Sequence, residues 1–164
     1  MSILELGFGY NRLLDSLLKL DFPFKYYSGI DISEFNVDNA WRISISPRIR
    51  FILGDFNEVE FDETYDLVIS SLTLKHQYPS FEQTLNNIKN YMNENAIIIF
   101  DLLEGDSEKN RWEVKNEYQN YLAFYSREEI LNVLQATGFG LIKFDYVFHQ
   151  LSIRRLLVIA QRMY

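Results

Sequence analysis

Residues 1–11 read MSILELGFGYN, and this stretch decides the fold class. A short apolar run, Ser2-Ile3-Leu4, ends at Glu5, and Gly7 and Gly9 follow it. Leucines then recur at helical spacing. Strand, glycine turn and helix are typical of a nucleotide-binding crossover, because glycine permits a tight turn and lets a ligand approach the backbone. The alternative is an ordinary turn between a strand and a helix, so the rest of the chain must support the ligand.

The composition fits a single α/β domain. A chain of 164 residues is long enough for one sheet with its covering helices. It contains no cysteine, so disulfides, thiolate zinc sites and cysteine nucleophiles are excluded. The net charge of −7 and the scattered basic residues disfavour nucleic acid and anionic membranes as partners. The sequence has no membrane-spanning apolar run and no secretory pattern, so we expect a cytoplasmic protein.

The second predicted strand, residues 26–30, ends at Asp31. An acidic side chain about two dozen residues after the glycine turn is placed to accept hydrogen bonds from both hydroxyls of a ribose. The alternative is that Asp31 or Ser33 caps the helix predicted from Glu34 to Ile43. Both interpretations are compatible.

The third predicted strand ends in a turn that contains Asp55 and Phe56. A carboxylate and a flat apolar ring suit the edge of a purine, and the alternative is a surface turn with a core phenylalanine. Residues 65–71 are almost wholly apolar, as a central parallel strand buried on both faces should be. Ser80 and Gln83 form a capping-box pattern that predicts the start of the next helix.

A fifth apolar strand, residues 96–100, follows a predicted turn at residues 93–95. Each of the five strands ends in a polar residue. Ligands bind at the carboxyl ends of the strands in such a sheet, so we expect these residues to lie along one rim. They are Glu5, Asp31, Asp55, Ser70 and Asp101.

The last third of the chain is less regular. Residues 105–125 are polar and rich in aromatics, and they predict a helical or irregular insert over that rim, on the substrate side. Ser126 and Glu129 form a second capping box. Two strands follow at residues 141–148 and 154–160. The gap between them is too short for a crossover helix, so they are antiparallel, unlike the usual dinucleotide dehydrogenase plan.

The segments LELGFGYN, GIDIS, GDF, YDLVISSLTLKH, IIIFD, YSREEILNVLQATGF and RRLLVIAQR, in this order, resemble the class I S-adenosylmethionine-dependent methyltransferases, in particular the branch that acts on small molecules. The resemblance implies one domain over residues 1–164. Its fold is an α/β, Rossmann-like three-layer sandwich, whose mostly parallel seven-stranded sheet ends in an antiparallel C-terminal hairpin. S-adenosylmethionine would be the cofactor and S-adenosylhomocysteine the product.

The same resemblance implies a cofactor site. The glycine loop would surround the methionine part, Asp31 would take the ribose, and Ile32 would pack on adenine. Asn11 stands where a third glycine is frequent, and asparagine also tolerates tight turns. The full set of cofactor-binding residues is Glu5, Gly7, Gly9, Asn11, Asp31, Ile32, Asp55, Phe56, Ser70 and Ser71.

Methyl transfer is an in-line displacement at a sulfonium carbon, so the protein must orient the acceptor and exclude water, and for a hydroxyl or protonated amine it must remove a proton. His76 is the first candidate for that base, because the pKa of an unperturbed histidine lies near neutrality. The alternative is a solvent-facing loop histidine. Asp101 could orient an acceptor group, and Arg111, Tyr121 and Tyr125 could shape the substrate pocket, with simple packing as the alternative for the aromatic residues. The predicted catalytic residues are His76, Asp101 and Tyr125.

Several other chemistries are disfavoured. The N/D-P-P-Y/F motif is missing after the fourth strand, which disfavours methylation of planar amide or adenine amino groups, and no metal-ligand spacing appears. A metal-independent oxygen, nitrogen or carbon methyltransferase for a small metabolite remains. We interpret His149 as structural, and Arg154-Arg155 as a solvated strand start rather than an anion site.

Members of this family usually carry helices before the first strand, whereas this sequence starts on the strand. We therefore expect an apolar sheet face that a homo-oligomer or hetero-oligomer would cover. One alternative function is a non-catalytic S-adenosylmethionine-binding subunit whose cover comes from a partner chain. The other is a nicotinamide-dependent oxidoreductase on a similar sheet.

Overall fold

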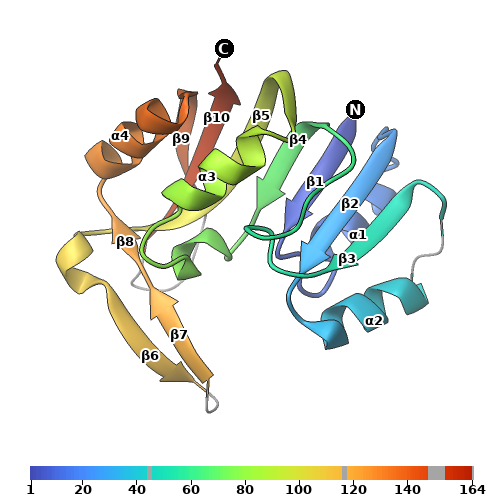
Figure 1. Cartoon of the computed structure of the whole chain (residues 1–164), viewed down its shortest axis with the longest axis horizontal. Coiled ribbons are helices and arrows are strands. Elements are labelled where there is room, and N and C mark those ends of the chain that lie inside the picture. Colours follow the sequence, from blue (N-terminus) through green and yellow to red (C-terminus); the bar gives the residue numbers. More distant parts are fainter. Residues whose placement is uncertain (44–45, 116–117, 148–153, 164) are drawn as a thin grey trace.

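A mixed sheet forms the centre of the computed structural model, which describes residues 1–43, 46–115, 118–147 and 154–163 (Figure 1). Seven strands follow the order β3-β2-β1-β4-β5-β10-β9, and β8 pairs with the end of β5. The first five strands of the chain pair in parallel, whereas β10 is antiparallel to β5 and β9. The expected α/β sheet with an antiparallel C-terminal hairpin is confirmed.

The observed bounds lie within two residues of the expected ones for most strands. The strands are β1 Ser2–Leu6, β2 Tyr26–Asp31, β3 Ile49–Leu53, β4 Tyr65–Ser70, β5 Met92–Glu104, β6 Arg111–Lys115, β7 Tyr118–Leu122, β8 Phe124–Tyr125, β9 Phe139–Val147 and β10 Arg155–Arg162. The helices are α1 Arg12–Lys19, α2 Glu34–Ile43, α3 Glu82–Lys89 and α4 Arg127–Thr137. None of the helices in these described ranges has the length and apolarity needed to span a bilayer.

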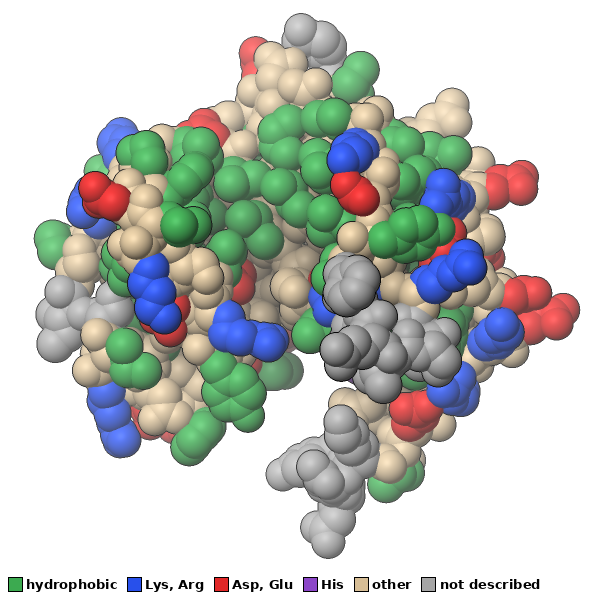
Figure 2. All heavy atoms as spheres, turned by 180° about the vertical axis from the view of Figure 1, so that it is seen from behind, with side chains coloured by type: hydrophobic (Ala, Val, Ile, Leu, Met, Phe, Trp, Pro, Cys, Tyr) green, Lys and Arg blue, Asp and Glu red, His purple; other side chains and the backbone are tan. Residues whose placement is uncertain are grey.

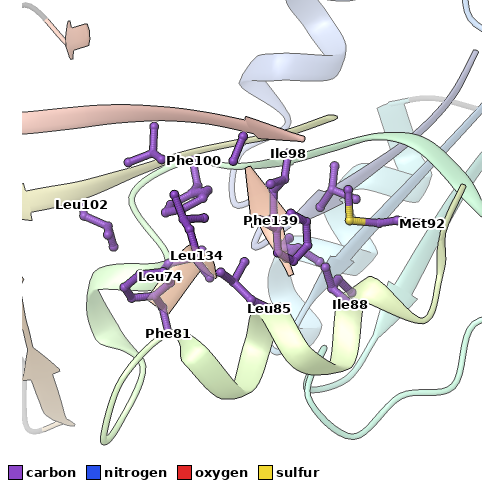
Figure 3. Packing of buried hydrophobic residues seen from close by; sticks show 14 of the residues in the cluster. Leu74, Phe81, Leu85, Ile88, Met92, Ile98, Phe100, Leu102, Leu134 and Phe139 are labelled. Atoms are coloured by element: carbon purple, nitrogen blue, oxygen red, sulfur yellow. The ribbon is translucent and has the colours of Figure 1, made fainter. Parts of the chain in front are cut away.

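Two apolar clusters on opposite faces of the sheet make the three layers. Leu14 of α1 and Val37 of α2 pack on β1 to β3 in one cluster. Leu85 of α3 and Leu134 of α4 pack on β4, β5 and β10 in the other, where Phe100 is fully buried (Figure 3). Burial of these apolar side chains drives the packing of the helices on the sheet, because apolar area removed from water contributes about 25 cal/mol per Å².

The insert at residues 105–125 differs from the expected helical or irregular segment. It holds a short 3₁₀ turn, the antiparallel hairpin β6–β7 and the short strand β8. Trp112 and Tyr121 are opposite each other across the hairpin, with ring centroids 5.3 Å apart. Aromatic pairs of this kind stabilise antiparallel strands, which explains why an aromatic-rich polar segment forms a hairpin.

Two further local predictions are wrong, and one is confirmed. The helix α3 begins at Glu82, and Ser80 accepts a hydrogen bond from the Glu82 backbone N–H at 3.1 Å, so no Ser80–Gln83 capping box forms. The turn expected at residues 93–95 lies inside β5, as an irregularity of strand register where Asn95 has a φ of 60°. The capping box at the start of α4 is present.

One face of the sheet carries the expected apolar surface. On β4, β5 and β10, the apolar side chains that face α3 and α4 are buried, whereas six apolar side chains on the opposite face are half-buried. Figure 2 shows apolar side chains gathered on that side of the molecule. These half-buried residues are Leu67, Ile69, Ile97, Ile99, Leu157 and Ile159. A homo-oligomer or hetero-oligomer that covers this face stays a prediction.

Candidate active site

A cavity of about 720 Å³ lies over the carboxyl ends of the parallel strands. Pockets of about 300–1,000 Å³ are the size that drug-sized ligands and cofactors occupy. The loops after β1 to β4 and the start of β10 form its walls. Of the residues predicted from the sequence, the wall includes Glu5, Gly7, Gly9, Asp31, Ile32, Asp55, Phe56, Ser71 and His76.

The glycine loop lies against one wall in a left-handed backbone conformation. Gly7 has a φ of 71°, and a Cβ there would overlap the hydroxyl of Thr73. Gly9 has a φ of 54°, and a Cβ there would meet no atom within 4 Å. The loop therefore needs glycine for two different reasons. At Gly7 the neighbouring loop is too close for a side chain, whereas Gly9 leaves an open cradle beside the cavity.

Two residues expected at the cofactor lie outside the wall of this cavity. Asn11 has a φ of 58°, so it does adopt the left-handed turn that a third glycine would provide, but its buried side chain sits at the start of α1. The hydroxyl of Ser70 donates a hydrogen bond of 3.2 Å to the carbonyl of Leu6. The Ser70 hydroxyl thus joins β4 to β1, whereas the Oδ1 atom of Asn11 is buried with no hydrogen-bond partner among the described residues.

Asp31 occupies the position expected for a ribose-binding carboxylate, at the end of β2 and in the cavity wall. Its Oδ2 accepts from the backbone N–H of Gly9 at 2.8 Å, and its Oδ1 accepts from the N–H of Ser33 at 2.9 Å and from the Asn36 amide at 3.2 Å. Ser33 in turn accepts from the Asn36 backbone. Asp31 therefore orders the glycine loop and lines the cavity, while Ser33 caps α2.

The adenine side of the expected site is apolar with one carboxylate. Ile32 is 75% exposed at the cavity, and Phe56 is 8% exposed, so most of its ring packs in the core. The Oδ1 of Asp55 accepts from the backbone N–H of Asn57 at 2.8 Å, which fixes the carboxylate at the turn.

Glu5 is a buried carboxyl group in the cavity wall. It accepts a hydrogen bond from the hydroxyl of Tyr27. Burial raises the pKa of Glu5 to about 7, and this effect exceeds the lowering by the Tyr27 hydrogen bond. Glu5 therefore titrates near neutral pH inside the fold.

His76 lies in the loop after β4 and lines the cavity. Its Nδ1 is 2.7 Å from the carbonyl oxygen of Tyr121 on the β6–β7 hairpin. A carbonyl only accepts, so Nδ1 carries the proton in this contact and Nε2 is the nitrogen that can accept one. The backbone N–H of Ala123 also donates to the Lys75 carbonyl. These two bonds join the hairpin to the loop that carries His76.

Asp101 is buried beside the cavity and does not line it. Its Oδ1 accepts from the backbone N–H of Leu72 at 2.8 Å, and its Oδ2 lies 2.9 Å from both Nε and Nη2 of Arg155. The prediction that Arg155 is solvated is wrong: its side chain is 12% exposed and lines the cavity, whereas Arg154 is exposed. The burial follows from antiparallel pairing of β10 with β5, which brings Arg155 to Asp101.

Tyr125 is buried in the core, where its ring meets Phe81 at a centroid distance of 5.0 Å. Burial raises the pKa of Tyr125 to about 12. It lies outside the cavity wall, as does Arg111, which pairs with Glu113 at 2.7 Å. His149 lies outside the described residues.

Other wall residues went unnoticed in the sequence. Arg12, Thr73 and Gln77 line the cavity, as does Arg155, predicted from the sequence to be solvated. A signal was available for Thr73 and Gln77, because they flank the His76 segment after β4. Arg155 gave no such signal, since only the pairing of two distant strands brings it to the site.

A comparison with protein families matches residues 1–143 to the family described as a methyltransferase domain. The chain belongs to this methyltransferase family. The resemblance to class I S-adenosylmethionine-dependent methyltransferases is therefore confirmed.

Two curated relatives of this chain are named malonyl-[acyl-carrier protein] O-methyltransferase. The Bacillus cereus protein is 25% identical over 141 residues, which are 80% of this chain and 52% of that protein. The Bacillus anthracis protein is 23% identical over 143 residues, which are 81% and 52%. The chain thus spans about half the length of these relatives.

Solved structures share the fold of this chain at low identity. An S-adenosylmethionine-dependent methyltransferase from Listeria monocytogenes superposes with a TM-score of 0.82 at 16% identity, over 99% of this chain and 91% of that one. The 1,6-didemethyltoxoflavin-N1-methyltransferase of Burkholderia thailandensis was solved with bound 1,6-didemethyltoxoflavin and S-adenosylhomocysteine. It superposes with a TM-score of 0.79 at 19% identity, over 99% of this chain and 71% of that one.

Proposed function

We propose that this chain binds S-adenosylmethionine in the cavity and transfers its methyl group to an oxygen, nitrogen or carbon of a small molecule. One observation carries the proposal: a single cavity unites the glycine loop, Asp31 and Asp55 with the segment after β4 that carries His76. Family membership supports methyl transfer as the reaction. The relatives supply only the reaction type, since the chain spans about half of their length.

The wall residues fit this cofactor in chemistry and in space. S-adenosylmethionine supplies a methyl group on a positively charged sulfur. The open cradle at Gly9 leaves room for a ligand beside the backbone, and Asp31 is positioned to accept from ribose hydroxyls. Ile32 offers exposed apolar surface for a base, and Asp55 offers a carboxylate for an exocyclic amine.

The acceptor would enter beside the segment after β4. In that position Ser71 and Thr73 line the wall, and the backbone there is fixed by Asp101 through Leu72. For a hydroxyl or ammonium acceptor, Nε2 of His76 would take the proton. Wall residues that hold the acceptor in line with the methyl group raise its effective concentration.

Calorimetry and a product assay test the proposal together. The purified chain is titrated with S-adenosylmethionine, S-adenosylhomocysteine and NAD⁺, and the release of S-adenosylhomocysteine is then followed by mass spectrometry with a broad acceptor pool. We expect micromolar binding of the two adenosyl compounds, no binding of NAD⁺ and transfer to at least one acceptor. Binding without transfer would support the non-catalytic subunit, and binding of NAD⁺ alone would support the oxidoreductase.

A further inference from the structure

We infer that the acceptor side of the cavity binds a carboxylate and that Arg155 is the residue that binds it. This inference rests on the proposed function, and it names the class of acceptor.

Sheet order divides the charges of the cavity wall. β3, β2 and β1 lie on one side of β4, and β5, β10 and β9 lie on the other. The acidic wall residues Asp55, Asp31 and Glu5 belong to the β1–β3 side, whereas Arg155 begins β10. The second arginine of the wall, Arg12, lies on the acidic side, where its charge lowers the pKa of Glu5. A cationic donor therefore suits one half of the cavity and an anionic acceptor suits the other.

Asp101 fixes the orientation of the Arg155 side chain. Its Oδ2 engages Nε and Nη2 at 2.9 Å, and its Oδ1 holds the backbone N–H of Leu72, which has a φ of 62°. A non-glycine residue at this φ is strained and persists only where its surroundings hold it. The same buried carboxylate thus positions the arginine and the segment after β4.

The guanidinium is a planar fork with five N–H donors on three nitrogens. Asp101 engages two of those nitrogens on one edge, and within the described residues no other bond uses the Nη1 donors, which we assign to a second acceptor. The side chain also lines the cavity, and we place this second edge toward the ligand. A planar carboxylate matches the fork better than a hydroxyl or an amine does.

A carboxylate also simplifies the chemistry. One oxygen of the acceptor forms a bond to the methyl carbon while the bond from that carbon to sulfur breaks. The electron pair of the broken bond stays on sulfur, which loses its positive charge, and the acceptor becomes a neutral methyl ester. No proton moves, so the reaction needs no base. The neutral ester is also held less strongly by Arg155 than the carboxylate, which favours product release.

The test measures acceptor binding directly on the chain loaded with S-adenosylhomocysteine. The probes are malonate, succinate, benzoate and malonyl-N-acetylcysteamine, each compared by calorimetry with the corresponding neutral amide. We expect at least one carboxylate to bind ten times more tightly than its amide. When the chain is given S-adenosylmethionine and the same acid, it should form the methyl ester of the acid and S-adenosylhomocysteine in equal amounts.

Variants distinguish a contact between Arg155 and the carboxylate from general effects of net charge and folding. Arg155→Gln should abolish the preference for the acid over the amide, and Arg155→Lys should keep part of it. Arg154→Gln is the matched control, because its side chain is exposed one residue away, and it should keep the full preference. If Arg155→Gln alone fails to fold, the double variant Asp101→Asn/Arg155→Gln removes both charges. Thermal melting and S-adenosylhomocysteine affinity within threefold of wild type show that a variant is folded.

The outcomes distinguish the two proposals. A chain that binds S-adenosylhomocysteine but binds no carboxylate more tightly than its amide overturns this inference and leaves the proposed function standing. A preference that survives in Arg155→Gln also overturns it. A chain that does not bind S-adenosylhomocysteine overturns both.

Discussion

The hydroxyl of Tyr27 donates a hydrogen bond to the carboxyl group of Glu5, and both side chains are buried beneath the glycine loop. Burial raises the pKa of Glu5 to about 7 and raises the pKa of Tyr27 well above its ordinary value. The wall of the cavity thus contains a carboxyl group whose charge changes near neutral pH.

We predict that the stability of the ligand-free chain falls as pH rises between about 4.5 and 7. The pKa of Glu5 is higher in the folded state, so folding binds a proton that the unfolded chain has released in this window. Glu5→Gln removes this dependence, because glutamine is neutral at every pH. At pH 8 the variant should gain on the order of 2–3 kcal/mol in free energy of unfolding relative to wild type.

Urea denaturation at pH 4, 6 and 8 measures this effect. The difference between Glu5→Gln and wild type should be close to zero at pH 4 and reach its full size above pH 7. Glu58→Gln, an exposed glutamate outside the cavity wall, is the matched control for the substitution itself. Equal stability of Glu5→Gln and wild type at pH 8 would contradict the raised pKa.

Alanine at Gly7 and at Gly9 should produce different defects. Gly7→Ala combines a strained φ with overlap of Thr73, so we expect a loss of about 2–4 kcal/mol in stability. Gly9→Ala carries only the backbone strain, about 1–2 kcal/mol, but its methyl group enters the cradle. Its affinity for S-adenosylhomocysteine should fall at least tenfold.

Denaturant melts and calorimetry on both variants measure these effects. Thr73→Ala in the Gly7→Ala background should restore part of the stability, because it removes the closest atoms. If Gly9→Ala binds S-adenosylhomocysteine with wild-type affinity, the ligand does not lie against this part of the loop.

Asp31→Ala should weaken the binding of S-adenosylmethionine by one to two orders of magnitude. This corresponds to about 1.5–3 kcal/mol for lost hydrogen bonds to a charged group, and the loop loses its anchor at the Gly9 N–H as well. Calorimetry measures the affinity. The control is Asp38→Ala, which removes an exposed carboxylate from the following helix α2. Wild-type affinity in Asp31→Ala would remove Asp31 from the site.

His76→Gln separates the kinds of acceptor. With a carboxylate acceptor no proton moves, so kcat at saturating S-adenosylmethionine should stay within threefold of wild type and show no new pH dependence. With a hydroxyl or amine acceptor, kcat should fall by about 10²–10⁴ if His76 is the general base. A fall of that size with a carboxylate acceptor would show that His76 acts in some other way, and steady-state kinetics from pH 5.5 to 8.5 decide between these results.

Much of the fold is predictable because its signals are local. The glycine turn, the apolar strand at residues 65–71 and the Ser126–Glu129 capping box each depend on neighbouring residues, and the structure contains all three. The hairpin β6–β7 was less predictable, since its strands depend on cross-strand contacts such as Trp112 with Tyr121. The Ser80 prediction failed because α3 begins at Glu82, and the Ser80 hydroxyl accepts from the backbone N–H of Glu82 at 3.1 Å instead of from that of Gln83.

The sequence by itself determined the parallel sheet, the glycine loop and the acidic residues at the ends of β1 to β3, because strand periodicity and turn chemistry are written in adjacent residues. Only the tertiary structure decided that Arg155 lies in the cavity wall, that its guanidinium is paired with the buried Asp101 and that Tyr125 is buried in the core. These placements depend on strands that are distant in the chain and adjacent in the sheet, and no local pattern records which side chains such a pairing brings together.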